Sequence, residues 1–179
     1  MDFTAVIKTR RSVRAYSDRP IPHEVLGRVL EAARLAPSAC NFQPWRYILV
    51  QDAAARSQLA KLAHNQHFVA QAPVVIVCCG KRYPNSNSWI GESLYLIDLG
   101  IAIEHLALAA RNEGLGTCWI GAFQDQPIKK LLRVPADYDI IMLLPMGYPV
   151  SEDQFSATTA RLALEQIVFS ERFGKIQGT

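Results

Sequence analysis

One long apolar segment, residues 92–112, most constrains what this chain can fold into. Its leucine, isoleucine and alanine residues fall on nearly every face of a helix, whereas a surface helix confines them to one stripe. Such a helix needs apolar cover on all sides, and a chain of 179 residues has little material to supply that cover alone. The segment therefore predicts a central core helix, and it is a first indication of a homodimer.

The same segment is too polar at its centre to suit a membrane. Asp98, Glu104 and His105 lie near its middle, and charged side chains are costly in lipid. No apolar signal pattern follows Met1, and the formal net charge of +3 is too mild to indicate nucleic-acid binding. We therefore expect a soluble, cytoplasmic protein that binds neither a membrane nor a nucleic acid.

The order of helix and strand patterns favours an α+β fold in one domain over residues 1–179. Helices are predicted at residues 2–9, 22–35, 53–63, 92–112 and 126–132, and strands at residues 46–51, 74–79, 117–120 and 138–144. The β-branched run at 74–79 indicates a strand that is buried on both faces. Pro145 is expected to end the last strand, and residues 162–172 are expected to form a short turn and a strand.

Several common kinds of site lack their patterns in this sequence. No G-x-G-x-x-G follows a strand and no P-loop pattern occurs, which argues against a Rossmann dinucleotide site. His64 and His67 are spaced as metal ligands can be, but no third ligand lies nearby, so we expect no metal site. The four cysteines have no C-x-x-C spacing and are expected to be buried, reduced thiols.

Two short polar segments carry the chemistry that the sequence offers. Residues 10–14, Arg-Arg-Ser-Val-Arg, place three guanidiniums close together, and these forked cationic donors suit phosphate or carboxylate. Residues 36–45 place Ser38, Asn41 and Gln43 between two prolines, as neutral partners for a sugar alcohol or a heterocycle. We interpret the two segments as walls of a site for a phosphorylated, polyhydroxylated, aromatic ligand. A solvated basic segment and an ordinary polar loop remain the alternatives.

Together with later motifs, these segments resemble the FMN-dependent nitroreductase family in its short form. The further motifs are Ala72-Pro73, Asp98, Leu108-Ala109-Ala110, residues 114–121, Met146-Gly147-Tyr148-Pro149 and Arg161. The resemblance implies a mixed central β-sheet flanked by helices and a C-terminal segment exchanged in a homodimer. It also implies two FMN sites at the dimer interface, each built from both subunits.

The resemblance further implies a role for each residue of the site. Arg10, Ser12 and Arg161 are expected to clamp the phosphate, with Arg11 near the phosphate and the ribityl chain. Arg14 is expected to face the pyrimidine edge of the flavin.

The remaining roles concern the walls around the flavin ring. The partner subunit is expected to supply Pro37, Ser38 and Asn41, with Gln43 as a supporting contact. The turn beside flavin N5 is expected to comprise Gly116, Thr117, Ile120 and Gly121, with a backbone N–H from Ile120 or Gly121 near N5.

The activity implied is that of an FMN-dependent oxidoreductase that takes hydride from NADH or NADPH and passes it on. The order is ping-pong through flavin N5, and the acceptors are nitroaromatics or quinones. The flavin carries this chemistry, so no catalytic side chain is expected. A non-catalytic flavin protein for storage or redox sensing is the alternative. Thr159 departs from the family, because many relatives have a basic residue there, and residues 64–67 receive no assigned contact.

Overall fold

The computed structural model of the protein describes residues 1–84, 89–156 and 160–174. Its helices are α1 (Phe3–Thr9), α2 (His23–Arg34), α3 (Ala53–Leu62), α4 (Phe68–Gln71), α5 (Trp89–Asn112) and α6 (Asp125–Leu132). Its strands are β1 (Trp45–Val50), β2 (Val74–Lys81), β3 (Gly116–Thr117) and β4 (Tyr138–Gly147). Short 3-10 turns lie at η1 (Ala39–Asn41), η2 (Glu152–Phe155) and η3 (Leu164–Gln166). The α+β class is confirmed, and α4 is an addition to the predicted elements.

The four strands form one sheet in the order β1-β2-β4-β3, and each neighbouring pair is antiparallel. The mixed sheet expected from the family is therefore not found among the strands of the described chain. A parallel pairing does occur as an isolated bridge between Ser12 and Thr117, which joins the N-terminal segment to β3. This bridge places the arginine segment at the β3 edge of the sheet.

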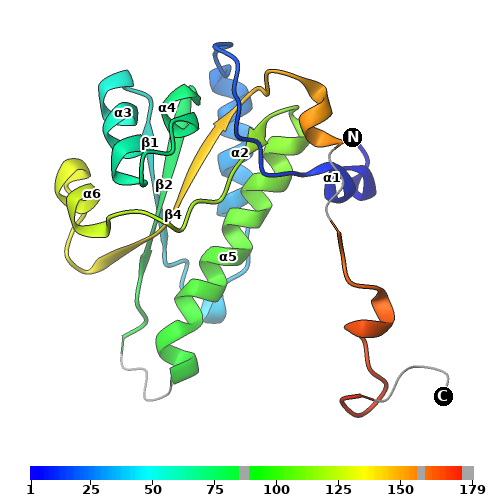
Figure 1. Cartoon of the computed structure of the whole chain (residues 1–179). Helices are drawn as coiled ribbons and strands as arrows, with labels where there is room; N and C mark the ends of the chain where they lie inside the picture. Colours follow the sequence, from blue (N-terminus) through cyan, green and yellow to red (C-terminus); the bar gives the residue numbers. More distant parts are fainter. Residues whose placement is uncertain (85–88, 157–159, 175–179) are drawn as a thin grey trace.

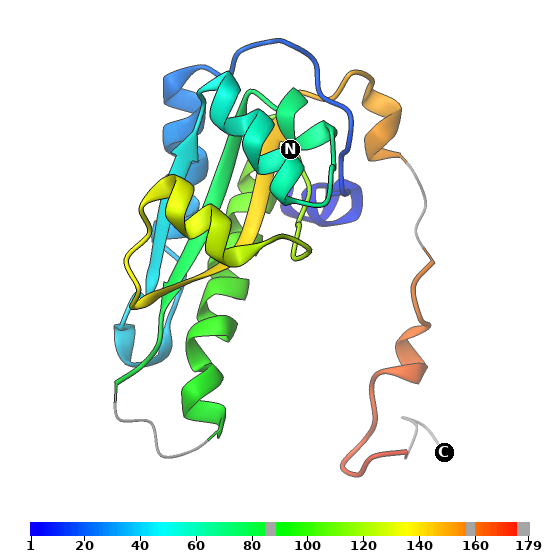
Figure 2. The same cartoon turned by 60° about the vertical axis from the view of Figure 1, so that its left-hand side comes forward.

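Helices cover the sheet on both faces (Figures 1 and 2). One face carries α2 and α5, and Ile76 and Cys78 of β2 point into that core. The other face carries α3, α4 and α6, and Val77 and Cys79 point there. This arrangement confirms that β2 is buried on both faces. Three thiols are buried as expected, but Cys40 is exposed, so the prediction was wrong for that thiol.

Helix α5 is the central core helix that its apolar sequence predicts. Leu99 and Ile103 are fully buried in a core that the same chain forms with α2 and the sheet. By length and composition alone, Ser93–Asn112 could cross a membrane, but one side of it packs in this core. The single chain buries more of this helix than we expected from a chain of its length. It nevertheless leaves Leu96 41% and Ile97 55% exposed.

Strand β4 continues through Pro145, although the sequence predicted an end there. Pro145 lies opposite Val75 of β2, and its carbonyl accepts a hydrogen bond from the Cys118 N–H at 3.4 Å, on the β3 side. The nitrogen and carbonyl of one strand residue point the same way, so the missing N–H also faces the short β3 side. No hydrogen bond to β2 is lost, and the proline is tolerated inside the strand.

The C-terminal tail, residues 160–174, stands apart from the helices and the sheet (Figures 1 and 2). Its regular structure in the described part is the turn η3, so the strand expected within 162–172 is not found there. Strand N–H and C=O groups need partners, and a segment that stands alone supplies none. Phe173 is 94% exposed, so the tail presents apolar surface to the solvent.

Gly116 allows the arginine segment to lie directly against β3. A Cβ atom on Gly116 would lie 2.5–2.8 Å from the Cβ and both Cγ atoms of Val13, closer than real side chains approach. The Val13 N–H donates to the Thr117 carbonyl at 2.9 Å across the same contact. The glycine is therefore required by close packing between two backbones.

The substitution Gly116→Ala should destabilise the protein by about 1–3 kcal/mol, the range for overpacking a tight site. The branched side chain of Val13 is stiff and buried, so it cannot rotate away. Gly27→Ala in α2 is the control, because a Cβ there meets nothing within 4 Å; it should stabilise by about 0.5–1 kcal/mol. Urea unfolding measures both changes. A Gly116→Ala protein as stable as the wild type would contradict this contact.

Candidate functional site

The segment from Arg10 to Tyr16 is fixed by buried contacts that alternate with exposed side chains. Val13 is buried, and the Tyr16 hydroxyl donates to the Val13 carbonyl at 2.7 Å and to the Pro145 carbonyl at 3.1 Å. Burial raises the pKa of Tyr16 well above its ordinary value, so the phenol keeps its proton and remains a donor. Ser12 and Arg14, on either side of Val13 in the sequence, are exposed. The structure thus presents both side chains on a rigid backbone.

The Ser12–Thr117 bridge brings the arginine segment beside the turn at 116–121. Cys118 marks where the two meet: burial raises the pKa of its thiol, while Arg14 and the Ser12 hydroxyl act in the opposite direction. Both polar side chains therefore reach the same spot beside the turn. Cys118 was missed as a site neighbour, because only the parallel bridge places it there.

One of the two backbone donors predicted to face the flavin is already engaged. The Ile120 N–H donates to the Leu143 carbonyl at 3.0 Å, and Ile120 is buried. Gly121 is exposed, and the space where its Cβ would stand is open. Gly121 is therefore the better candidate for a backbone donor at this edge, and Ile120 fixes its position.

Arg10 is oriented by a carboxylate from the core helix. Its Nε lies 3.1 Å from Oε1 of Glu104 on α5, and both side chains are partly exposed. The pKa of Glu104 is raised, chiefly by burial, and Arg10 and then His105 partly offset that effect. Arg11 donates from Nη1 to the Arg10 carbonyl at 2.8 Å. Glu104 was not predicted as part of the site, because its partner lies far away in the sequence.

The second predicted wall, residues 37–43, lies elsewhere in the chain. The Ala39 N–H donates to Oδ1 of Asp98 on α5 at 3.1 Å, and the Gln43 N–H donates to the Ser38 hydroxyl at 2.9 Å. Pro37, Asn41 and Gln43 are exposed. Asp98 and Glu104 are about 9 Å apart along the helix axis and point to different sides of it. A single chain therefore leaves the two walls apart.

The third predicted contributor, Arg161, also stands away from the arginine segment. It is exposed, and its Nη1 donates to the carbonyl of its neighbour Ala160 at 3.1 Å. Thr159 lies outside the described residues. His64 and Asn65 are exposed with positive φ angles of 57° and 60°, and nothing in the described chain gives them a role at the site.

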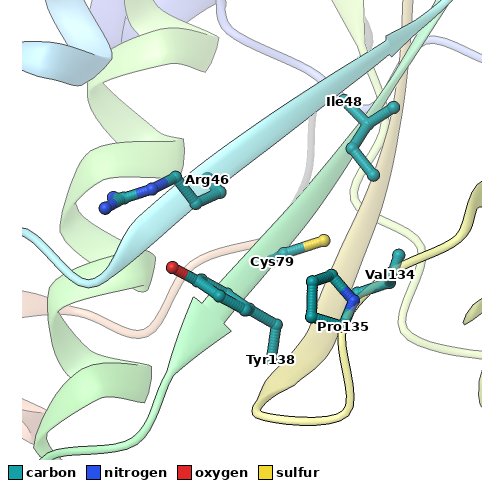
Figure 3. A pocket seen from close by; sticks show the side chains of 6 residues that line it. All are labelled: Arg46, Ile48, Cys79, Val134, Pro135 and Tyr138. Carbon is teal, nitrogen blue, oxygen red and sulfur yellow. The ribbon is translucent and has the colours of Figure 1, made fainter.

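A pocket of about 260 Å³ lies on the sheet face opposite α5, and no predicted site residue lines it (Figure 3). Its lining comprises Arg46, Ile48, Cys79, Val134, Pro135 and Tyr138. In Figure 3 the guanidinium of Arg46 points away from the other lining residues. Arg46 donates instead to the carbonyls of Trp45 at 2.6 Å and Gln43 at 3.3 Å. The pocket is apolar and offers nothing for a phosphate, and the described residues contain no cluster of metal ligands.

Known proteins resemble this chain in sequence and in fold. The model of the nitroreductase family matches residues 7–81 and 61–148. An Archaeoglobus fulgidus protein, provisionally named an NADH dehydrogenase/NAD(P)H nitroreductase, is 32% identical over 170 residues, or 90% of this chain and 94% of that protein. The NAD(P)H-linked FMN reductase of Bacillus subtilis is 30% identical over 179 residues, or 91% of this chain and 71% of that protein. A solved nitroreductase family protein from Clostridium novyi has a TM-score of 0.80 at 28% identity, covering 99% of this chain and 97% of that one.

The raised pKa of Glu104 gives a prediction with a definite sign. A carboxyl whose folded-state pKa lies above its ordinary value of 4.5 contributes stability at low pH, and this stability is lost as pH rises through the folded-state pKa. Glu104→Gln removes the titration and keeps an oxygen acceptor for Arg10. The variant should therefore be at least as stable as the wild type at pH 7, and its advantage should vanish near pH 4. Urea unfolding at both pH values measures this difference.

Glu113, the first residue after α5, is the matched control, because it also pairs with an arginine. Its carboxylate accepts two hydrogen bonds from Arg28, at 2.9 and 2.7 Å, and these bonds lower its pKa. The sign is then reversed: Glu113→Gln should be less stable than the wild type at pH 7, and the deficit should shrink as pH falls. Two variants that respond alike to pH would contradict the assignment of Glu104 as a desolvated partner of Arg10.

Proposed function

Because this chain belongs to the nitroreductase family, we propose that it is an FMN-dependent NAD(P)H oxidoreductase. The observation that carries the proposal is the parallel pairing of Ser12 with Thr117, which places the segment that contains the three arginines next to the 116–121 turn. This arrangement fits a phosphorylated flavin, because the cations and the Ser12 hydroxyl lie on one ordered segment next to an exposed backbone donor at Gly121. A NAD(P)H-linked FMN reductase among the relatives supports the same assignment.

Different residues would bind different parts of the cofactor. Arg10 and Ser12 would bind the phosphate, and Arg161 would join them from a tail. Arg14 would place a fixed positive charge at the pyrimidine edge, where negative charge gathers when the ring is reduced. The bound FMN supplies the hydride chemistry at N5. Gly121 would offer its backbone N–H beside that atom, so no side chain of this chain needs to act as acid, base or nucleophile.

The acceptors proposed are nitroaromatics and quinones, reduced in alternation with oxidation of NADH or NADPH. The open space beside Gly121 is compatible with a flat ring that approaches a flavin there. The same framework without turnover would serve flavin storage or redox sensing, and steady-state reduction of an acceptor distinguishes the two functions.

The active unit that we propose is a homodimer with exchanged tails. The chain alone keeps the two walls apart, and a partner would bring residues 37–43 to the arginine segment. Apolar surface supports this: a shallow groove of about 330 Å³ is lined by Phe3, Ala32, Leu35, His105 and Leu108. Apolar side chains of the tail are exposed at Leu162, Leu164, Ile167, Val168 and Phe173. A partner subunit that covered the groove and the tail would remove both apolar surfaces from water.

The function is tested on the purified protein. It should be yellow, with one FMN per chain, and should oxidise NADH or NADPH steadily when menadione or nitrofurazone is present. Heat-released cofactor that proved to be FAD, or no flavin after reconstitution, would contradict the cofactor. Bound FMN without turnover of any acceptor would favour the storage or sensing function instead.

The dimer is tested at Ile97, which lies on α5 and is exposed in the single chain. Leu99 and Ile103 are unsuitable, because both belong to the core of the single chain and a charge there would unfold it. Ile97→Glu should give a folded monomer that loses FMN, since a buried unpaired charge at an interface costs about 3–5 kcal/mol. Ala54→Glu, on the exposed side of α3, is the control and should change neither property. Light scattering and flavin fluorescence on one sample measure both, and a monomer with full FMN affinity would refute the shared site.

A further inference from the structure

We infer that Asp98 is a positioning residue, which acts with Tyr83 to hold the loop at residues 37–43 in the shape that a flavin wall requires. The inference rests on the proposed function, because it assigns that loop to the FMN site. It adds two residues that no site prediction includes and that do not themselves need to touch the cofactor.

Asp98 is a carboxylate in an otherwise apolar part of α5, and it is only 3% exposed. Burying a carboxylate is unfavourable unless hydrogen bonds replace the lost water. Both oxygens have partners here: Oδ1 accepts from the Ala39 N–H at 3.1 Å, and Oδ2 accepts from the Tyr83 hydroxyl at 2.5 Å. The carboxylate therefore faces the loop, and its bonds cross 59 residues of sequence to reach Ala39.

The loop needs such support because its backbone is strained. Cys40, Asn41 and Gln43 have positive φ angles of 50°, 54° and 53°. Residues other than glycine rarely adopt this backbone conformation. Within the loop, the Asn41 N–H donates to the Ser38 carbonyl at 3.0 Å. Ala39 directly precedes the strained residues, so the hydrogen bond that its N–H donates to Asp98 anchors the strained turn where it begins.

Tyr83 lies in the segment that follows β2 and also binds Ala39. We call the hydrogen bonds of Asp98 and Tyr83 to Ala39 the clamp. The Tyr83 hydroxyl lies within hydrogen-bond distance of the Ala39 carbonyl, at 2.9 Å, as well as of Asp98, so one proton is shared between two acceptors. Burial and the hydrogen bond to Asp98 raise the pKa of Tyr83, so the phenol remains a donor. Its ring packs on Phe42 with centroids 4.4 Å apart. Tyr83 therefore contacts both the backbone of the loop, at Ala39, and a side chain of the loop, at Phe42.

The consequence for function follows from where the held residues lie. Ser38 and Asn41 are the polar groups that we propose for the flavin wall, and they flank the clamped Ala39. Releasing the clamp would let the strained turn relax, and these two side chains would lose their common orientation. FMN affinity should fall although neither Asp98 nor Tyr83 touches the cofactor.

The test uses Tyr83→Phe, which removes one hydroxyl and keeps the ring on Phe42. Tyr95→Phe is the matched control, because the Tyr95 hydroxyl also donates to a carboxylate, Oδ2 of Asp139 at 3.0 Å, away from the loop. Tyr83→Phe should weaken FMN binding about tenfold, as loss of a hydrogen bond to a charged group would. Tyr95→Phe should lower the stability of the protein about as much as Tyr83→Phe does, but it should leave FMN affinity unchanged. Asp98→Asn, which cannot accept from Tyr83 at its amide nitrogen, should weaken FMN at least as much as Tyr83→Phe.

Amide hydrogen exchange gives a readout that a general loss of stability would not move. The Ala39 amide should exchange faster in Tyr83→Phe and keep its wild-type protection in Tyr95→Phe. FMN affinity and Ala39 protection that stay at wild-type values in both Tyr83→Phe and Asp98→Asn would overturn the inference. Equal weakening by Tyr83→Phe and Tyr95→Phe would overturn it as well. A wild-type protein that bound no FMN would instead refute the proposed function.

Discussion

The candidate site depends on one backbone contact, the close approach of Val13 to Gly116 at the short edge of the sheet. It sets the N-terminal segment parallel to β3 through the Val13–Thr117 hydrogen bond, and Tyr16 fixes the same segment to β4. Arg10, Ser12 and Arg14 acquire their positions from that pairing. Without it, the three arginines would be an ordinary solvated basic segment, which is the alternative that the sequence alone leaves open.

Helix α5 and the turn that follows it tie the surface segments to this core through three acidic side chains. Asp98 holds the loop at 37–43, Glu104 holds Arg10, and Glu113 near the end of the helix holds Arg28 of α2. The apolar faces of the helix bury it, and its carboxylates emerge at different levels. The helix that organises the core therefore also sets the spacing between the two walls of the site.

Much of the fold follows from local sequence, whereas much of the site does not. The β-branched run of β2 and the apolar length of α5 predict their elements, because periodicity and burial are local properties. The continuation of β4 through Pro145 depends on which neighbour faces the proline nitrogen, and a strand in the tail depends on a pairing edge. The roles of Asp98 and Glu104 come from partners distant in the chain. Spacing within a single segment contains no information about such contacts.

The pairing of Gly116 with Gly147 at the β3 edge has a consequence for how this protein can evolve. A Cβ on Gly116 would strike Val13, and one on Gly147 would strike Pro73 at 2.6 Å, so bare backbones determine how closely the layers approach. The exposed side chains at positions 12 and 14 take no part in that contact. These two residues can be substituted without moving the backbone that carries them. Ligand preference can therefore change during evolution while the fold stays the same.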